Sequence, residues 1–109
     1  MPVSIVIERK PNGRLAPVGG DRRGVKLNEE VTITRSAELD ALDLRITFTG
    51  RSPFRTSDDP EHSFSYNQTQ KVVRAHAAGG ENIYKYKCHR NGQPPSDEDG
   101  GEIEIEPGG

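Results

Sequence analysis

The seven residues 83–89, with the sequence IYKYKCH, constrain the fold more than any other stretch of this chain. Two tyrosines and the only cysteine, Cys88, alternate there with two lysines. Because successive side chains of a β-strand point to opposite faces, this period of two predicts a strand with one buried and one solvent-facing side.

The same alternation recurs along the chain and predicts further short strands. The 12 glycines and eight prolines cluster between the apolar runs, which is typical of tight turns rather than of long helices. We expect strands at residues 3–7, 15–18, 31–35, 44–48, 63–66, 71–77 and 103–105. Residues 21–24 are expected to form a polar turn. The last strand is expected at a sheet edge, because its outward glutamates discourage pairing.

These patterns predict an all-β fold, an antiparallel two-sheet β-sandwich with at most one short helix. The helix is expected within residues 36–43, where Leu39 and Leu42 lie three positions apart. A length of 109 residues suits one domain, residues 1–109. We expect its acidic C-terminal end to be flexible.

Charge and cysteine usage narrow the classes of function. A net charge of -2 argues against non-specific binding to nucleic acid, so no nucleic-acid partner is expected. Residues 1–55 hold ten basic and seven acidic side chains, whereas residues 56–109 hold five and ten. This asymmetry indicates either solvated loops with an acidic tail or a polar contact surface. A single cysteine, no apolar leader and no membrane-length run predict a soluble cytoplasmic protein without a membrane partner, with a processed secreted form as the alternative.

The central part of the chain carries a family resemblance. A strand at residues 44–48, a long loop after Gly50, a turn at Gly79 and Gly80, and a strand of alternating aromatics ending in Cys88 follow one another. This order resembles the cupredoxin-like β-sandwich over a little under half of the chain. The resemblance implies a cupredoxin-like Greek-key sandwich, and the strand pattern alone leaves an immunoglobulin-like sandwich as the alternative.

The copper site of that family needs two imidazoles, a thiolate and a weak axial ligand. Cys88 stands where the thiolate would be, but His89 is adjacent to it and points to the opposite face of a regular strand. The first histidine would follow Pro53, and Phe54 stands there. We therefore expect a degenerate, non-functional copper site and no cofactor. If copper does bind, its candidate ligands are Cys88, His62, His76 and His89.

Two further sites keep alternative interpretations. Cys88 is either a small buried hydrophobe or, if exposed, a thiol activated by the cations around it. His62 lies close in sequence to Asp58, Asp59, Glu61 and Ser63, from which a hydrolytic triad could be drawn. No nucleophile elbow precedes the serine, so we expect no catalytic residue and no enzymatic activity.

By elimination, the sequence predicts a non-enzymatic binding domain that contacts another protein of unknown identity. Contact is expected through the 50–62 loop, the 90–101 loop or a sheet edge. The candidate protein-binding residues are Arg55, Asp58, Asp59, His62, Arg90 and Asp97. The alternative is a copper-binding protein of the cupredoxin type, for electron transfer or metal handling through Cys88. The oligomeric state is left open.

Overall fold

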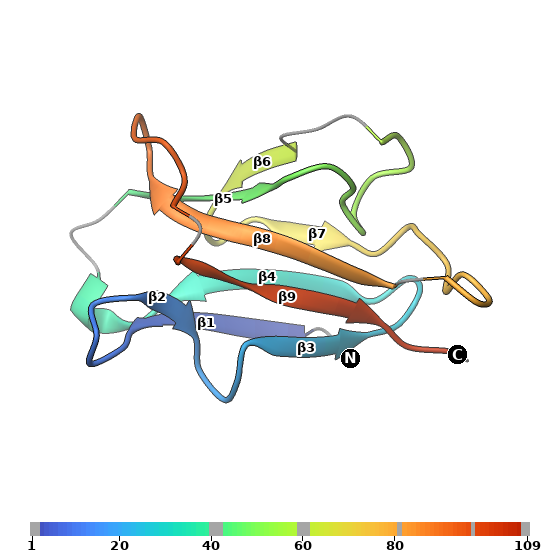
Figure 1. Ribbon diagram of the computed structural model, residues 1–109, viewed down its shortest axis with the longest axis horizontal. Helices are drawn as coiled ribbons and strands as arrows, with labels where there is room; N and C mark the ends of the chain where they lie inside the picture. Colours follow the sequence, from blue (N-terminus) through green and yellow to red (C-terminus); the bar gives the residue numbers. More distant parts are fainter. Residues whose placement is uncertain (1–2, 40–42, 59–61, 81, 97, 108–109) are drawn as a thin grey trace.

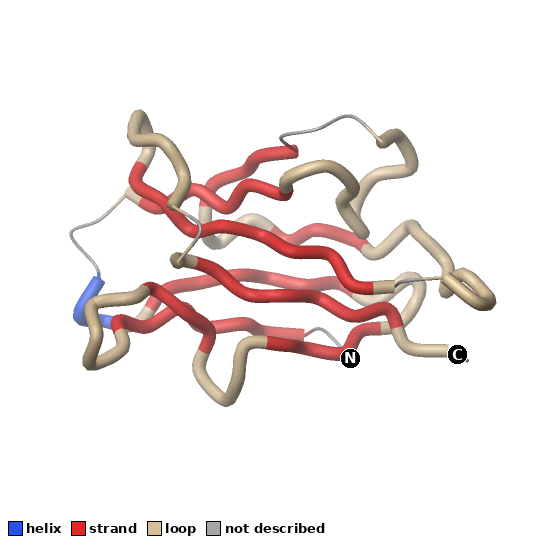
Figure 2. The backbone as a smooth tube through the Cα atoms, in the orientation of Figure 1, coloured by secondary structure: helices blue, strands red, loops and turns tan. Residues whose placement is uncertain are grey.

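The computed structural model describes residues 3–39, 43–58, 62–80, 82–96 and 98–107. Figure 1 shows two sheets packed face to face, and Figure 2 shows that loops join nearly all of the strands. The four-stranded sheet has the order β2 (Leu15–Pro17), β1 (Val3–Arg9), β4 (Glu30–Arg35) and β7 (Thr69–Lys71). The five-stranded sheet has the order β3 (Arg22–Val25), β9 (Gly100–Ile105), β8 (Ile83–Arg90), β5 (Leu44–Phe48) and β6 (His62–Ser65).

This architecture confirms the all-β, two-sheet sandwich. The short helix is a single 3-10 turn, η1 (Ala37–Leu39), which buries Leu39. Leu42 lies outside the described residues. No helix in the described part of the chain has the length and apolar character needed to cross a membrane.

The prediction of purely antiparallel sheets is wrong for two pairs of strands. Strand β1 pairs in parallel with β4, and β3 pairs in parallel with β9. Parallel neighbours need a long crossover connection. Here the connection between β1 and β4 includes β3, which belongs to the other sheet.

The expected edge position of the last strand is also wrong, because β9 lies between β3 and β8. Its outward Glu102 is opposite Lys85 on β8 and opposite Arg22 on β3. Arg22 Nη2 lies 3.0 Å from Glu102 Oε2. Cationic neighbours on both sides thus offset the charge that was expected to repel a pairing strand.

Two other local predictions need correction. Residues 21–24, expected as a turn, contribute most of β3, because Arg22 and its neighbours pair beside the acidic β9. The expected strand at residues 71–77 is mostly loop, and β7 ends at Lys71. Val72 is buried, but the next backbone N–H, that of Val73, donates to Pro53 O at 2.9 Å instead of continuing the ladder.

The core lies between the sheets and follows the period of two. The strands that bury every second side chain contribute most of it, namely Val3, Ile5, Ile7, Val31, Ile33, Leu44, Ile46, Phe48, Tyr84, Tyr86, Cys88, Ile103 and Ile105. Phe48 is the centre of an aromatic cluster, with its ring 5.5 Å from that of Phe54, 6.3 Å from Phe64 and 5.6 Å from Tyr86. Burying each large apolar side chain contributes about 1.5–3 kcal/mol, so this cluster supplies much of the stability.

Candidate functional site

The loop that follows β5, residues 50–58, is anchored to the core although it has no regular structure. Phe54 is buried and packs edge-on against Phe48. The Ser52 side chain is only 1 % exposed, and its Oγ accepts a hydrogen bond from Phe54 N at 3.2 Å. Ser52 Oγ also lies 2.8 Å from His62 Nδ1. These contacts hold the first half of the loop against the sandwich.

Arg74 holds the second half of loop 50–58. Its Nε donates to Ser52 O at 2.8 Å, and its Nη2 donates to Ser57 O at 2.6 Å and to Asp58 Oδ1 at 2.7 Å. The Arg74 side chain is 13 % exposed. Hydrogen bonds from a guanidinium are stronger than neutral ones, and its planar fork fixes their directions. One buried arginine therefore fixes the course of the loop.

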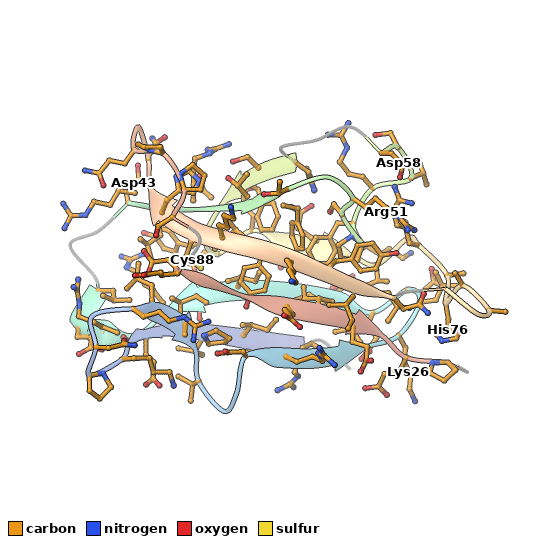
Figure 3. The ribbon with its side chains drawn as sticks, in the orientation of Figure 1. Lys26, Asp43, Arg51, Asp58, His76 and Cys88 are labelled. Carbon is orange, nitrogen blue, oxygen red and sulfur yellow. The ribbon has the colours of Figure 1, made fainter. Side chains whose placement is uncertain are left out.

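The outer surface of loop 50–58 is charged. The side chains of Arg51 and Asp58 are 50 % and 73 % exposed, and Arg51 Nε lies 3.6 Å from Asp58 Oδ1. Arg51 also donates to Tyr84 Oη at 3.2 Å, which ties it to β8. Figure 3 shows Arg51 and Asp58 at the same end of the sandwich. The loop thus presents a donor and an acceptor on a fixed backbone.

His62 is half-buried, and its Nδ1 contacts the buried hydroxyl of Ser52 in this loop. Desolvation by burial lowers the pKa of His62, and the nearby positive charge of Arg55 lowers it further. Arg55 itself is half-buried. His62 therefore contacts loop 50–58 at its buried end. Asp58 is more exposed than either His62 or Arg55.

The triad drawn from sequence does not assemble around His62 in the described residues. Ser63 follows His62 in β6, so its side chain lies on the opposite face, where Ser63 Oγ accepts from Arg45 Nε at 2.8 Å. The hydroxyl beside His62 is that of Ser52, which is too deeply buried for a substrate to reach. Asp59 and Glu61 lie outside the described residues.

The second group of predicted binding residues lies at the other end of the molecule. Figure 1 shows the connection between β8 and β9 at the opposite end from loop 50–58. Arg90 is exposed there, and Asn91 N donates to Asp43 O at 2.8 Å. Asp97 lies outside the described residues. The predicted binding residues that the structure describes thus divide between two ends of the sandwich.

Cys88 is fully buried at the centre of the sandwich, opposite Ile46 of β5. Burial raises the pKa of the Cys88 thiol to about 12, and the negative charge of Asp99 acts in the same direction. A thiol must lose its proton to act as a nucleophile or a metal ligand. In this position Cys88 acts as a small apolar side chain.

The three histidines lie apart from this sulfur. His89 is on the outer face of the sheet, with Nε2 2.7 Å from Thr47 Oγ1 and Nδ1 2.8 Å from Gln93 O. A carbonyl only accepts hydrogen bonds, so Nδ1 carries a proton. His76 is exposed in a loop, and Figure 3 shows it far from Cys88. No group of three or more potential metal-binding side chains gathers within the described ranges.

Sequence reasoning missed a depression of about 530 Å³ where β9 begins. It opens beside Gly100 and Gly101, which carry no side chains, and Arg14 lies along it. Arg14 Nη2 donates to Gly100 O at 3.2 Å, and Nη1 donates to Asp21 Oδ2 at 3.1 Å. Tyr86 also contributes to the lining, and its buried hydroxyl has no hydrogen-bond partner among the described residues. The glycine pair was the one sequence signal for this feature.

The contacts of Ser52 and Arg74 were also missed, because they join residues 22 positions apart. Neither side chain belongs to a recognisable motif, and only the path of the chain brings them together. Comparison with known proteins adds no assignment: no protein-family model matches the chain, and no curated protein matches it.

Proposed function

We propose that this protein is a non-enzymatic binding domain that presents loop 50–58 to a protein partner. The observation that carries the proposal is the contact of Arg74 with Ser52, Ser57 and Asp58, which holds an exposed loop in one conformation. Binding residues are commonly carried on loops positioned by a rigid scaffold.

A fixed loop favours binding because less freedom is lost when the complex forms. Ordering a long side chain at an interface costs about 0.5–1.5 kcal/mol, and disordered backbone adds to that cost. In this chain, the hydrogen bonds of Arg74 and the packing of Phe54 already order the backbone of the loop. The partner then has to order only those exposed side chains of the loop that make no such contact.

The chemistry of the loop indicates a polar partner surface. Asp58 offers a carboxylate that is 73 % exposed, and Arg51 offers a guanidinium that is 50 % exposed. A surface with one cation and one anion suitably spaced would pair with both. Charges at the rim of an interface contribute mainly to specificity and association rate, so complex formation should weaken with salt.

The cupredoxin-like relationship remains a hypothesis beside this proposal. The succession of β5, loop 50–58 and β8 carrying Cys88 supports it. Copper binding through Cys88 has no comparable support, because a copper ligand must be a thiolate and burial raises the pKa of this thiol to about 12. We therefore favour protein binding over metal handling.

The proposal can be tested with two matched charge substitutions. Thr56→Glu adds one negative charge to the exposed surface of loop 50–58, and Gln93→Glu adds the same charge to an exposed loop at the other end. Thr56 contributes only its backbone carbonyl to the hydrogen bonds of Arg74, and neither side chain takes part in them. Both variants should fold like the parent chain, as checked by circular dichroism.

Affinity purification from the native host, with quantitative mass spectrometry, then compares the three proteins. We expect a partner that the parent chain and Gln93→Glu retain equally, and that Thr56→Glu retains at least about tenfold less, since an interface charge mismatch costs more than about 1.4 kcal/mol. Identical recovery of partners by all three proteins would refute the role of the loop.

A further inference from the structure

The two sheets end in four edge strands, β2 and β7 in one sheet and β3 and β6 in the other. An edge strand presents unpaired backbone N–H and C=O groups, to which another strand can bind. Natural proteins block such edges with proline, charge, short length or a covering segment. The four edges of this sandwich differ in how well they are blocked.

The edge of β2 is closed at both of its outward positions. The pairing of β2 with β1 leaves Leu15 and Pro17 facing away from the sheet. The backbone N–H of Leu15 donates to Asp99 Oδ1 at 2.8 Å. Pro17 has no N–H to offer.

Charge protects the edges of β3 and β7. Strand β3 carries the exposed Arg22 and Arg23, and the carboxylate of Glu106 lies against Gly24. Strand β7 has only three residues and ends in the exposed Lys71. An incoming strand would have to desolvate these charged groups.

The edge of β6 is short as well, but its four residues, His62–Ser65, include neither a proline nor a lysine, arginine or carboxylate. Tyr66 N donates to Leu44 O at 3.2 Å, and this bond shows which residues of β6 direct their backbone groups toward β5. Because hydrogen bonding alternates along an antiparallel pair, the N–H and C=O groups of Ser63 and Ser65 point away from β5.

We propose that this edge pairs with the β6 edge of a second copy of the chain. Two β6 strands placed antiparallel about a two-fold axis at Phe64 bring Ser63 opposite Ser65 of the second copy. In this register the outward groups of both serines form four backbone hydrogen bonds. The result is one continuous ten-stranded sheet across two copies.

The side chains of β6 are compatible with this self-pairing. Phe64 faces Phe64 of the second copy, and His62 faces the position of Tyr66, so aromatic rings are opposite each other on the inner side. Hydroxyl groups are opposite each other on the outer side. No carboxylate faces a carboxylate and no lysine or arginine faces another, because the strand contains none of them. An isologous contact of this kind closes at the dimer and does not grow into a filament.

The contact is short, so the dimer should be weak. Four residues per copy bury less area than a standard stable interface, and complexes of that size are transient. We expect a dissociation constant in the range of about 10 μM to 1 mM. This inference is independent of the binding role of loop 50–58, since it concerns strand β6 rather than the loop, and a second copy of the chain rather than another protein.

Amide hydrogen exchange of the unmodified chain tests the pairing without a substitution. In the monomer, the outward N–H groups of Ser63 and Ser65 should exchange quickly, whereas that of Phe64 is bonded to β5. Raising the protein concentration from about 10 μM to about 1 mM, the span of the expected dissociation constant, should slow exchange at the two serines by about twofold if the constant is near 1 mM and by about sevenfold if it is near 10 μM. Exchange rates independent of concentration would overturn the proposal.

Sedimentation of two matched variants gives a second test. Ser65→Pro removes an outward N–H and leaves the ladder with β5 intact. Thr69→Lys places a charge on the edge of β7, in the other sheet. The parent chain and Thr69→Lys should show the same rise in average mass with concentration, and Ser65→Pro should remain monomeric. A dimer that persists in Ser65→Pro would show that another surface is used.

Discussion

Replacing Tyr86 with phenylalanine should make the protein more stable, which is unusual for a substitution in a well-packed core. The Tyr86 side chain is 2 % exposed, and its hydroxyl is buried without a hydrogen-bond partner among the described residues. A buried hydroxyl that loses water and gains no partner costs about 1–3 kcal/mol. Tyr86→Phe removes that cost and keeps the ring that packs 5.6 Å from Phe48. We expect the free energy of unfolding to rise by about 1 kcal/mol or more.

Tyr84 provides the matched control, because it lies two residues away on the same face of β8 and is similarly buried. Its hydroxyl accepts a hydrogen bond from Arg51 Nη2 at 3.2 Å. Tyr84→Phe loses that bond and should lower the free energy of unfolding by about 0.5–1.5 kcal/mol. The same chemical change on one strand should therefore have opposite signs at the two positions.

Urea unfolding followed by circular dichroism measures both changes. At equal slopes, the midpoint should rise for Tyr86→Phe and fall for Tyr84→Phe. In thermal melts, about 4 °C per kcal/mol is expected for a domain of this size. A loss of about 1 kcal/mol or more in Tyr86→Phe would refute the reasoning, because it would mean that the hydroxyl has a partner such as an ordered water.

Further predictions concern the same core and the loop. Gly101→Ala should destabilise the protein by about 2 kcal/mol or more, because a Cβ there would lie 2.7 Å from the Tyr86 hydroxyl oxygen. In a Tyr86→Phe background the loss of stability should be smaller. A double-mutant cycle measured by chemical denaturation in which the two changes are simply additive would contradict the contact. Burial raises the pKa of the Cys88 thiol from its ordinary value of 9.0 to about 12, so between these values the unfolded chain binds fewer protons and stability falls as pH rises. The free energy of unfolding, measured by chemical denaturation across that window, should fall less steeply in Cys88→Ala, by about 1.4 kcal/mol per pH unit, and equal slopes would exclude a buried thiol. Arg74→Lys should lower stability by about 1–3 kcal/mol and speed proteolysis within loop 50–58, because an ammonium cannot reproduce the forked contacts; an unchanged cleavage pattern would count against the proposed fixing of the loop. Cu(II) added to the reduced protein should give no intense visible band, and a band that disappears in Cys88→Ser would restore the copper alternative.

The positions of most strands could be predicted from the sequence because the signal for them is local. In residues 83–89, alternation of aromatic and charged side chains specifies which face is buried, whatever the neighbouring strands are. The structure buries Tyr84, Tyr86 and Cys88 as that pattern requires. The weaker predictions were those based on charge alone, such as the edge position of β9, because they ignored what Arg22 and Lys85 would supply from adjacent strands.

The candidate site could be predicted only in part. The 50–62 loop was identified from its length and polarity, but its fixed conformation depends on Arg74, which no local pattern connects to Ser52. The loop near Arg90 was grouped with it, although the two lie at opposite ends of the sandwich. Which loops share an end depends on the direction of each strand, and pairing decides that direction.

By itself, the sequence determined that this chain forms a two-sheet β-sandwich around a thin core, because hydrophobic burial acts on each strand through its own alternation; the structure then placed Cys88 inside that core. Only the tertiary structure decided that β1 and β3 pair in parallel with distant strands, that Arg74 fixes loop 50–58, and that β6, which has no proline or charged side chain, lies at a sheet edge. These features join residues far apart in the chain, and hydrogen bonding between them is set by which strands become neighbours, a choice that no single segment encodes.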